Sequence, residues 1–360
     1  MFDKKLVIIS NYPNSDEIKD GMMQRVANID DYLLDYDRSY LQIGIKNNFR
    51  KYVKNEKHNM TKYKFNFLIH YFNILRILIK SDAIYVHSIY NFLRLIPFLL
   101  FLNKKNIILD FHGVVPEELE FMNKKFKSFI YNIVEKIAVS YSKHIIFVTE
   151  SMENYIANKY KLNNYKSYIL NIFSKNVFRT ANTDELDSLR DKYNINEDDV
   201  VFIYSGNTQK WQNIDLMLSC ISKIKNVKNY KFIILTGEIE IIKNKLEEFS
   251  LLAQNNIIID TVSPEELGKF YSIAHYGFVL RDEHILNSVA SPTKLVEYMW
   301  YGIIPIVKFE DLGDYSNLGY EYIKYENLHS TMNNLKSKTN DEIIKNISNN
   351  KFDMKLLIDV

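Results

Sequence analysis

Short apolar runs alternate with longer amphipathic stretches along the whole chain. Alternation of strand-sized runs with helix-sized stretches is typical of βαβ units that build a parallel sheet. The runs fall into two series separated by a polar segment, so we expect an α/β protein with two doubly wound domains. The first series is residues 6–10, 40–45, 83–87, 106–110 and 144–149, and the second is residues 200–206, 230–237, 256–260, 276–280 and 303–307.

The polar segment 174–199 marks the boundary between these domains. A chain of 360 residues is long enough for two domains of ordinary size, each with its own core. We predict a first Rossmann-like domain over residues 1–178, a second over residues 179–335, and a linker near 174–184. The tail 336–360 ends in the apolar run MKLLIDV, which can pack back on the body of the protein.

Charge and cysteine content exclude several classes of protein and site. Lys and Arg number 46 against 44 Asp and Glu, so no concentrated basic charge indicates a nucleic-acid partner. The single cysteine, Cys220, excludes an internal disulfide framework and a cysteine-cluster metal site, and the eight histidines lack metal-ligand spacing. The apolar part of the N-terminal segment MFDKKLVIISNYP is too short for a signal peptide. We therefore expect a cytoplasmic protein.

Two stretches, residues 63–80 and 89–105, combine aromatic and aliphatic residues with flanking Lys and Arg. The longest uncharged apolar run, Leu95 to Leu102, is far shorter than the roughly 20 residues needed to cross a bilayer. Two interpretations stay open. The stretches are core helices packed on a sheet, or residues 63–105 make peripheral contact with the inner face of the plasma membrane.

The segment SPTKLVEYMWYGIIPIV predicts a helix with well-marked ends followed by a buried strand. Ser291 suits the N-cap, Pro292 suits the first helical position, and Gly302 marks the end. Lys294 and Glu297 are three residues apart and are therefore neighbours on the helix surface. They form either a surface ion pair or, with the free amides of the helix N-terminus, part of an anion site.

A second loop with suitable chemistry lies in YSGNTQKWQNIDLML, after the first apolar run of the second series. Gly206 permits a tight turn, and Lys210 follows four residues later. The loop is neither a GxGxxG fingerprint nor a GxxxxGK[ST] loop. Because ligands bind at the carboxyl ends of parallel strands, we expect Lys210 and the helix that starts at Ser291 to form two walls of one diphosphate pocket, in a cleft between the domains.

Together these segments resemble the retaining, nucleotide-sugar-dependent glycosyltransferases of the GT-B fold, in the group called family 4. The resemblance covers nearly the whole chain, and SPTKLVEYM is its most specific part. It implies two Rossmann-like domains that face each other across a cleft, the first binding the acceptor and the second the nucleotide sugar. The matches are YSGNTQKWQNID (204–215), DTVSPEELGKFYSIAHYGFVLR (260–281) and SPTKLVEYMWYGIIPIV (291–307), with weaker ones at DGMMQRV (20–26), DFHGVVPEE (110–118) and VTESMENYI (148–156).

The resemblance also implies roles for the matching residues. Glu297 would accept hydrogen bonds from the ribose hydroxyls, Lys210 would neutralise the pyrophosphate, and His112 would face the reacting sugar, which makes these three the candidate catalytic residues. On the acceptor side it places His112, Glu117 and Glu118, with Gly21 in the loop after the first strand. The donor nucleotide sugar would be bound by Gly206, Asn207, Lys210, Arg281, Ser291, Pro292, Thr293, Lys294 and Glu297.

At one position the sequence departs from the family. Many members carry two glutamates separated by seven residues, and counting back from Glu297 the place of the first is taken by Val289. Asp282 or Glu283 can replace it if the loop that carries them folds back. Arg281 can point into the cleft or pair with either of these two acids on the surface.

The acceptor-side candidates have structural alternatives as well. His112 can bind a sugar hydroxyl or serve as a structural histidine. Glu117 and Glu118 can contact the acceptor or stabilise the start of the helix that follows Pro116.

We expect transfer of a sugar from a nucleotide-diphosphate sugar to a glycan or lipid-linked acceptor, with retention, in the biosynthesis of a cell-surface polysaccharide or glycolipid. Fixed positive charge and a helix dipole can stabilise the diphosphate leaving group, so no metal or other cofactor is expected. Two alternatives stay open: a sugar-nucleotide epimerase of the same fold, and a non-catalytic nucleotide-sugar or partner-binding module. The missing acid at Val289 keeps the second alternative open.

Overall fold

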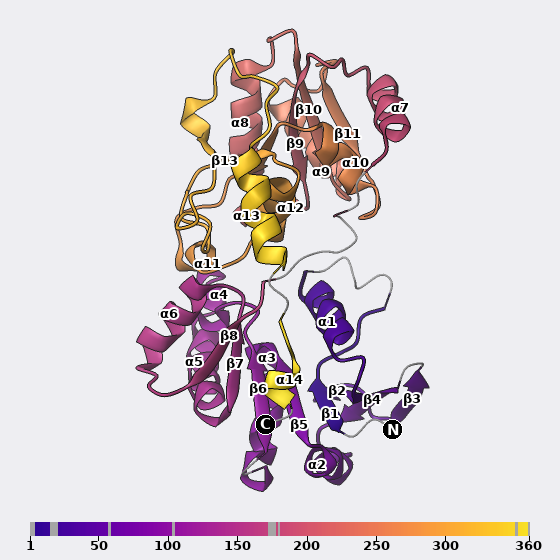
Figure 1. Cartoon of the computed structure of the whole chain (residues 1–360), viewed down its shortest axis with the longest axis vertical. Helices are drawn as coiled ribbons and strands as arrows, with labels where there is room; N and C mark the ends of the chain where they lie inside the picture. Colours follow the sequence, from indigo (N-terminus) through magenta and orange to yellow (C-terminus); the bar gives the residue numbers. More distant parts are fainter. Residues whose placement is uncertain are drawn as a thin grey trace. The chain divides into compact units, whose positions relative to one another are not determined.

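A computed structural model describes residues 4–14, 21–56, 59–102, 105–171, 178, 181–349 and 352–358. The chain divides into two compact units, which are shown in Figure 1. Unit 1 comprises residues 1–172 and 351–360, and unit 2 comprises residues 173–350. The predicted linker near 174–184 lies largely outside the described residues.

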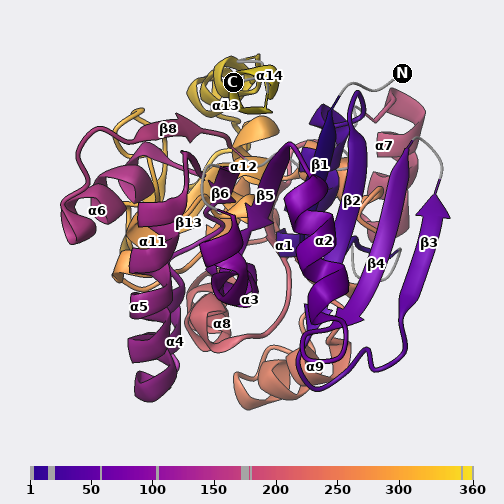
Figure 2. The ribbon, with the colours of Figure 1, turned by 90° about the horizontal axis from the view of Figure 1, so that it is seen from below.

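Unit 1 is built on an eight-stranded sheet in the order β3-β4-β2-β1-β5-β6-β7-β8. Its strand pairs are parallel, except that the edge strand β3 runs antiparallel to β4, as Figure 2 shows. The strands are β1 (Lys5–Ile9), β2 (Asp37–Gly44), β3 (Tyr52–Glu56), β4 (Met60–Asn66), β5 (Ala83–His87), β6 (Asn106–Asp110), β7 (His144–Phe147) and β8 (Lys166–Ile169). The helices are α1 (Gly21–Tyr32), α2 (Tyr71–Lys80), α3 (Ser88–Leu95), the 3₁₀ helix η2 (Ile96–Phe101), α4 (Val115–Phe121), α5 (Lys125–Tyr141), α6 (Glu150–Tyr160) and α14 (Lys355–Ile358).

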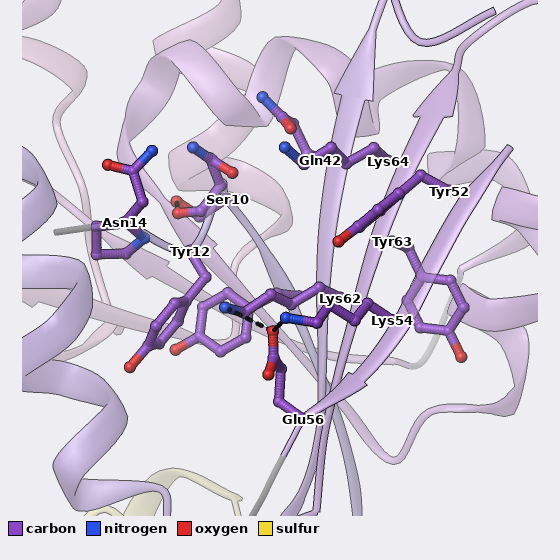
Figure 3. A pocket seen from close by; sticks show the side chains of 13 residues that line it. Ser10, Tyr12, Asn14, Gln42, Tyr52, Lys54, Glu56, Lys62, Tyr63 and Lys64 are labelled. Carbon is purple, nitrogen blue, oxygen red and sulfur yellow. Dashed lines mark hydrogen bonds and ion pairs between the residues drawn. The ribbon is translucent and has the colours of Figure 1, made fainter. Parts of the chain in front are cut away.

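Helices cover both faces of this sheet because its central strands are apolar on both sides. Leu6 and Ile8 of β1 pack with α1 and with the C-terminal helix α14. Helices α2, α3 and α5 contact strands β1, β5 and β6 and cover the opposite face. Near the edge of the sheet, strands β2, β4 and β3 and the loop after β1 enclose a cavity (Figure 3).

The C-terminal segment packs on unit 1, where Figure 1 shows helix α14 in yellow beside the purple strands. Asn106 donates a hydrogen bond to the carbonyl of Leu357, and Lys4 donates one to the carbonyl of Ile358. Residues 336–360 are predicted as one tail. In the structure its first part forms helix α13 of unit 2, and only its end returns to unit 1.

Unit 2 contains a parallel six-stranded sheet in the order β11-β10-β9-β12-β13-β14. Its strands are β9 (Val200–Ser205), β10 (Tyr230–Leu235), β11 (Ile257–Asp260), β12 (Tyr276–Val279), β13 (Ile304–Val307) and β14 (Ile323–Lys324). The helices are α7 (Thr183–Tyr193), η3 (Lys210–Gln212), α8 (Ile214–Ile224), α9 (Ile239–Glu248), α10 (Leu267–Ile273), α11 (Ile285–Ser288), α12 (Thr293–Trp300), η4 (Tyr325–Asn327) and α13 (Lys338–Asn349).

Helix α7 opens the described part of unit 2 with a capping box. The Asn182 side chain accepts a hydrogen bond from the Glu185 amide at 2.9 Å, and the Glu185 carboxylate accepts one from the Asn182 amide at 3.2 Å. These two bonds satisfy amide groups that the helix itself leaves without partners. The start of α7 therefore follows from the local sequence.

Helix α12 lies close against strand β12 because Gly277 has no side chain. A Cβ atom at this position would lie 2.3 Å from two ring carbons of Tyr298. The Tyr298 ring is fully buried and lies in the same core as Leu295 and Met299, which also belong to α12. Gly277 thus sets how closely the helix that carries Lys294 approaches the sheet.

The sequence prediction of an α/β protein with two doubly wound parallel sheets is confirmed. The runs 83–87 and 106–110 coincide with β5 and β6. The interpretation of residues 63–80 as one helical stretch is wrong, because residues 63–66 belong to strand β4. Strands β3 and β4 carry polar residues on a solvated edge, so they lack the continuous apolar run that marks a central strand. In the described ranges no helix combines the length and the apolar character needed to cross a membrane.

We predict that Gly277→Ala destabilises unit 2 by about 1–3 kcal/mol, because the added methyl group overlaps the Tyr298 ring. Gly237→Ala is the control, since no atom lies within 4 Å of a Cβ at that position. The two tryptophans, Trp211 and Trp300, both belong to unit 2, so urea unfolding followed by tryptophan fluorescence reports on this unit. Equal stability of the two variants would contradict the packing described.

Candidate functional site

The unit 2 sheet has a topological switch point between β9 and β12. Strands β10 and β11 lie on one side of β9, whereas β12, β13 and β14 lie on the other. Open α/β sheets bind ligands outside the carboxyl ends of their strands at such a point. Gly206 follows β9 and Arg281 follows β12, so both lie at this edge of the sheet.

The side chain of Lys294, from the first turn of α12, reaches the same edge. Its Nζ lies 3.7 Å from the centroid of the Tyr204 ring and donates a hydrogen bond of 3.1 Å to Oε1 of Gln212. Gly206 has a φ of +141°, and a Cβ there would lie 3.2 Å from Nζ. Only glycine suits this position, because other residues rarely adopt that backbone conformation and their side chains would crowd the ammonium group. We call these five residues the Lys294 site: Tyr204, Gly206, Gln212, Arg281 and Lys294.

Two basic side chains, Lys294 and Arg281, lie together at the Lys294 site. Desolvation and the nearby Arg281 together hold the pKa of Lys294 well below its usual range. Desolvation also lowers the pKa of Arg281, whose Nη1 donates a hydrogen bond of 3.2 Å to Oδ1 of Asn287. Within the described part of the chain neither side chain forms an ion pair with a carboxylate. An anion bound here would compensate both charges.

Glu297 lies one turn further along α12 and is buried, with 8% of its surface exposed. Its Oε2 accepts a hydrogen bond of 3.0 Å from the Tyr271 hydroxyl, which lies 2.7 Å from Oγ of Ser205. Burial raises the pKa of Glu297 to about 7, although the Tyr271 hydrogen bond and the Lys294 charge act in the opposite direction. Lys294 and Glu297 therefore do not form the surface ion pair that the sequence allows.

The Lys210 side chain does not lie beside Gly206, where the Lys294 side chain lies. It is the first residue of η3 and its side chain is exposed, so the ammonium group beside Gly206 belongs to Lys294. Asn207 contributes its backbone carbonyl, which accepts a hydrogen bond of 2.5 Å from the Tyr204 hydroxyl. The structure brings Gly206 and Lys294 of α12 together, and the predicted diphosphate pocket between Lys210 and this helix stays a prediction.

The predicted start of α12 needs a correction. The N-cap is Pro292 and the helix begins at Thr293, so Ser291 is not the cap. The Ser291 hydroxyl instead lies 2.9 Å from the hydroxyl of the buried Tyr315. Because its hydroxyl contacts Tyr315, Ser291 does not cap the helix. The amides of the first turn, from Thr293 onward, have no hydrogen-bond acceptor within the helix.

Val289, at the place of the missing family glutamate, is a buried residue at the end of α11, with 3% exposure. Asp282 forms an ion pair of 2.5 Å with Lys308. Glu283 is exposed. Replacement of the missing acid by Asp282 or Glu283 stays a prediction.

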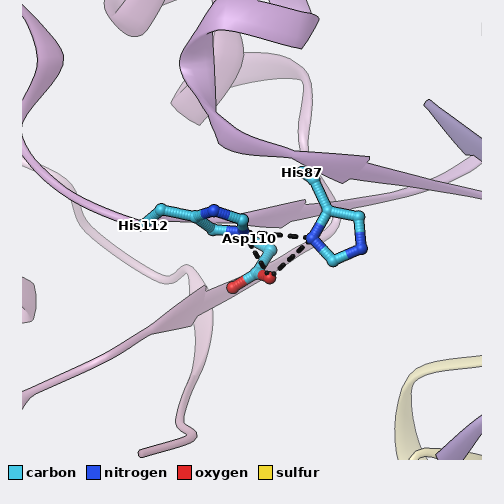
Figure 4. Close-up of side chains that lie close together, drawn as sticks. All are labelled: His87, Asp110 and His112. Carbon is cyan, nitrogen blue, oxygen red and sulfur yellow. Dashed lines mark hydrogen bonds and ion pairs between the residues drawn. The ribbon is translucent and has the colours of Figure 1, made fainter. Parts of the chain in front are cut away.

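Unit 1 has a second cluster of ionisable groups, the Asp110 cluster, formed by Arg25, His87, Asp110 and His112 (Figure 4 shows the last three). Nε and Nη2 of Arg25 both donate to the Asp110 carboxylate, at 2.9–3.0 Å and 2.5 Å. Nε2 of His112 and Nδ1 of His87 lie 3.0 Å and 3.2 Å from Oδ2 of Asp110, and 3.0 Å from each other. His87 and Asp110 are the last residues of β5 and β6, which explains why these side chains meet.

Charge in this cluster is compensated. Burial alone would raise the pKa of Asp110, but Arg25 and the two histidines more than offset it, and the pKa lies well below its usual range. Burial lowers the pKa of His87 to about 4, so this ring is neutral at physiological pH. Nε2 of His87 and Nδ1 of His112 are buried without a hydrogen-bond partner in the described part of the chain. His112, whose side chain is 9% exposed, can therefore still bond a ligand hydroxyl.

The same residues have the donor types of a metal site, since ligand atoms of His87, Asp110 and His112 lie within 4.8 Å of one another. However, both oxygens of Asp110 accept hydrogen bonds from Arg25. The guanidinium charge opposes a cation at this place. The cluster is therefore better suited to positioning His112 than to holding a metal ion.

The other acceptor-side candidates of unit 1 lie elsewhere. Oε1 of Glu117 accepts hydrogen bonds from Tyr155 at 2.7 Å and from Lys159 at 2.6 Å, which ties α4 to α6. Burial raises the pKa of Glu118, which is in the same first turn of α4. Gly21 is the first residue of α1, so its predicted place in a loop is wrong.

Comparisons with known proteins identify the fold. The sequence matches no protein-family model and no curated protein. The structure is similar to sucrose-phosphate synthase from Thermosynechococcus elongatus, with 11% identity and a TM-score of 0.65 over 99% of this chain and 96% of the other. It is also similar to Anabaena HepE in complex with UDP and glucose (9% identity, TM-score 0.62, 99% and 92%), and to WaaG, a glycosyltransferase involved in lipopolysaccharide biosynthesis (10%, 0.61, 99% and 93%).

The chain has the GT-B fold. The fold that the sequence resemblance implied is thus confirmed, whereas membership of family 4 stays a prediction. Sequence reasoning missed Arg25 and Tyr271, and it gave no partner for His87 at the end of β5. One backbone feature marks the His87 region: Ser88, which follows it, has a φ of +67°, a conformation that is uncommon outside glycine and clusters at functional sites.

We predict that Glu297→Gln changes how stability depends on pH. The pKa in the folded state, about 7, lies above the ordinary value of 4.5, so the stabilising effect of protonation is complete below about pH 4.5 and is lost as the pH rises through 7. The loss amounts to roughly 3 kcal/mol. Urea unfolding of both proteins from pH 4.5 to 8 should show a difference that shifts in favour of the variant as the pH rises. A constant difference would contradict the raised pKa.

Proposed function

We propose that this protein is a nucleotide-sugar-dependent glycosyltransferase that binds the donor diphosphate at the Lys294 site. The observation that carries the proposal is a pair of partly desolvated cations, Lys294 and Arg281, which lack carboxylate partners and lie at the switch point of a GT-B unit 2 sheet. Such a site suits a pyrophosphate, because two fixed charges and the amides at the start of α12 can share its negative charge.

Each residue then has a physical task. Lys294, Arg281 and the Thr293 amide hold the diphosphate and stabilise the charge that develops as it leaves, so the proposal requires no metal ion. Glu297, one turn further along the same helix, accepts hydrogen bonds from the ribose hydroxyls. Lys210 adds long-range attraction from the loop after β9. His112 in unit 1, held by Asp110, contacts the reacting sugar.

The substrates follow from the same reasoning and from the similar structures. One of them binds UDP and glucose, and another takes part in lipopolysaccharide biosynthesis. We propose a nucleotide-diphosphate hexose as donor, a glycan or lipid-linked hydroxyl as acceptor, and transfer with retention in cytoplasmic synthesis of a cell-surface polysaccharide or glycolipid.

Nucleotide binding tests the donor site. In calorimetric titrations with UDP, GDP, CDP and ADP, without metal, we predict that one nucleotide binds the wild type. Lys294→Met and Glu297→Ala should each weaken its binding by about 1.5–3 kcal/mol, roughly tenfold to a hundredfold, because each removes a charged hydrogen-bonding group. Lys243→Met is the matched control, since Lys243 forms an exposed pair with Glu240 on α9.

Lys210→Ala separates the two lysines. Because Lys210 is exposed, its removal should weaken binding less than removal of Lys294. If no nucleotide binds the folded wild type, or if both lysine variants and Glu297→Ala bind like the wild type, the donor site is wrong. Binding without sugar transfer to any acceptor would instead indicate a non-catalytic module.

Peripheral membrane contact is a further part of the proposal. Side chains at the start of α2 and in η2 form an exposed apolar patch: Leu68, Ile69, Phe72, Leu100 and Phe101. Phe72 and Leu100 are 82% and 84% exposed, and stacking of Tyr71 on Phe98 at 4.7 Å holds the two segments together. Arg76 and Lys80 follow in α2. Apolar side chains beside cations suit the surface of an anionic bilayer.

We predict that the protein co-sediments with phosphatidylglycerol vesicles more strongly than with phosphatidylcholine vesicles. The double variant Phe72→Asp/Leu100→Asp should lose most of this binding, because burial of both side chains is lost and two negative charges are added. Phe126→Asp is the control, because Phe126 is 76% exposed but lies on α5, outside the patch. Unchanged sedimentation of the double variant would remove the patch from the proposal.

A further inference from the structure

The cavity near the edge of the unit 1 sheet has a volume of about 190 Å³ and plays no part in the proposed donor site (Figure 3). The loop after β1 forms one wall, with Tyr12. The other walls come from β2, β4 and β3, which are adjacent in the sheet. Strand β1 is also next to the switch point of unit 1, between β1 and β5, where the strand order reverses. The wall formed by the loop after β1 therefore lies at the carboxyl end of β1, the end at which ligands of this architecture bind.

The strand register places two rows of polar side chains on one face of the sheet. Tyr40 of β2 pairs with Lys62 of β4, and Lys62 pairs with Lys54 of β3. In the next row, Gln42 pairs with Lys64, and Lys64 pairs with Tyr52. Paired residues in adjacent strands share a face, so three lysines from two strands line the same cavity.

The cavity carries excess positive charge. Lys54 and Lys62 share one carboxylate, with Nζ at 2.8 Å and 3.4 Å from Oε1 of Glu56. Lys64 has no carboxylate within ion-pair distance in the described part of the chain. Among the described residues that line the cavity, three lysines face one carboxylate, so a negatively charged ligand would compensate the remaining positive charge.

Aromatic and amide groups in the same walls favour a sugar ring. Tyr12 packs edge-on against Tyr40 at 4.9 Å, and Nζ of Lys62 lies 4.3 Å from the Tyr12 ring centroid. Tyr52 is 43% exposed at the opposite side. Oε1 of Gln42 is buried without a hydrogen-bond partner in the described ranges, and a ligand hydroxyl would satisfy it. The exposed Tyr52, an unsatisfied amide and excess cations together suit an acidic saccharide.

We propose that this cavity binds an anionic sugar unit of the acceptor, one that carries a carboxylate or a phosphate. The inference rests on the proposed glycosyltransferase function and adds the chemical class of its acceptor. A volume of about 190 Å³ equals about six water molecules and is below the usual 300–1,000 Å³ of ligand pockets. The cavity therefore takes a single unit of a longer acceptor, with the anionic group between Lys62 and Lys64.

Ligand-observed NMR titrations at low ionic strength test the proposal, with glucuronate, glucose 6-phosphate, glucose and inorganic phosphate as probes. We expect glucuronate or glucose 6-phosphate to bind at least about fivefold more tightly than glucose, because only they meet the lysine charges. Which of the two binds better distinguishes a carboxylate from a phosphate. Inorganic phosphate that binds as tightly as either sugar would overturn sugar recognition, and equal binding of glucose would overturn charge recognition.

Variants locate the binding in this cavity. Lys62→Met/Lys64→Met should weaken binding of the charged sugar at least about fivefold, whereas Lys136→Met, which removes an exposed lysine of α5, should leave it unchanged. Glu56→Gln should act in the opposite direction and strengthen binding a few-fold, because it removes the carboxylate that competes with the ligand. A loss of fold cannot produce this increase. Equal affinities of wild type, double variant and Glu56→Gln would overturn the site.

Nucleotide titration of the same proteins separates the two proposals. All unit 1 variants should bind the nucleotide like the wild type, since they leave the Lys294 site intact. If the nucleotide binds but no charged sugar does, only the acceptor subsite is wrong. If a charged sugar binds through Lys62 and Lys64 but no nucleotide binds, the cavity is a saccharide site and the glycosyltransferase proposal fails.

Discussion

The desolvation of ionisable side chains at the carboxyl ends of two parallel sheets is the constraint on which this protein depends. Parallel strands bring their last residues to one edge, and the helices that cover both faces exclude water from it. A charge placed there needs a partner or a shifted pKa. Each unit meets this constraint in its own way, and the difference indicates where a ligand belongs.

In unit 1 the constraint is met internally. The bidentate contact between Arg25 and Asp110 joins α1 to β6, and His87 and His112 complete the surroundings of the carboxylate. Removing one partner of such a buried pair is far more costly than the pair is worth in net stability. These contacts fix the orientation of the His112 ring. Asp110 bonds Nε2 of His112, and Nδ1 has no hydrogen-bond partner in the described part of the chain and is left for a ligand.

In unit 2 the constraint is left partly unmet. Lys294 has an amide oxygen and an aromatic face beside it instead of a carboxylate, and Glu297 is kept away from it in a separate contact with Tyr271. An anion that binds N-terminal to Glu297 on the same helix would restore the ordinary charge state of Lys294. Binding energy is thus available at this site before any substrate-specific contact is considered.

Particular residues show how far sequence reasoning reaches. Strands β5 and β6 follow directly from their apolar runs, and the capping box at Asn182 begins α7 as local chemistry requires. The motif around SPTKLVEYM predicts both a helix and a nearby anion site. The motif does not predict that the helix starts at Thr293 instead of Pro292. The Ser291 hydroxyl contacts the hydroxyl of Tyr315, which is distant in the chain, and Ser291 therefore does not cap the helix.

The sequence by itself determined the α/β class, the two-part organisation and the segments that carry the candidate site, since these depend on local periodicity and on turn and cap chemistry. Only the tertiary structure decided that Lys294 and not Lys210 lies beside Gly206, that His87 meets Asp110, and that three lysines line one cavity. These relations join residues that are far apart in the chain. Strand register and helix packing set them, and no local pattern records either one.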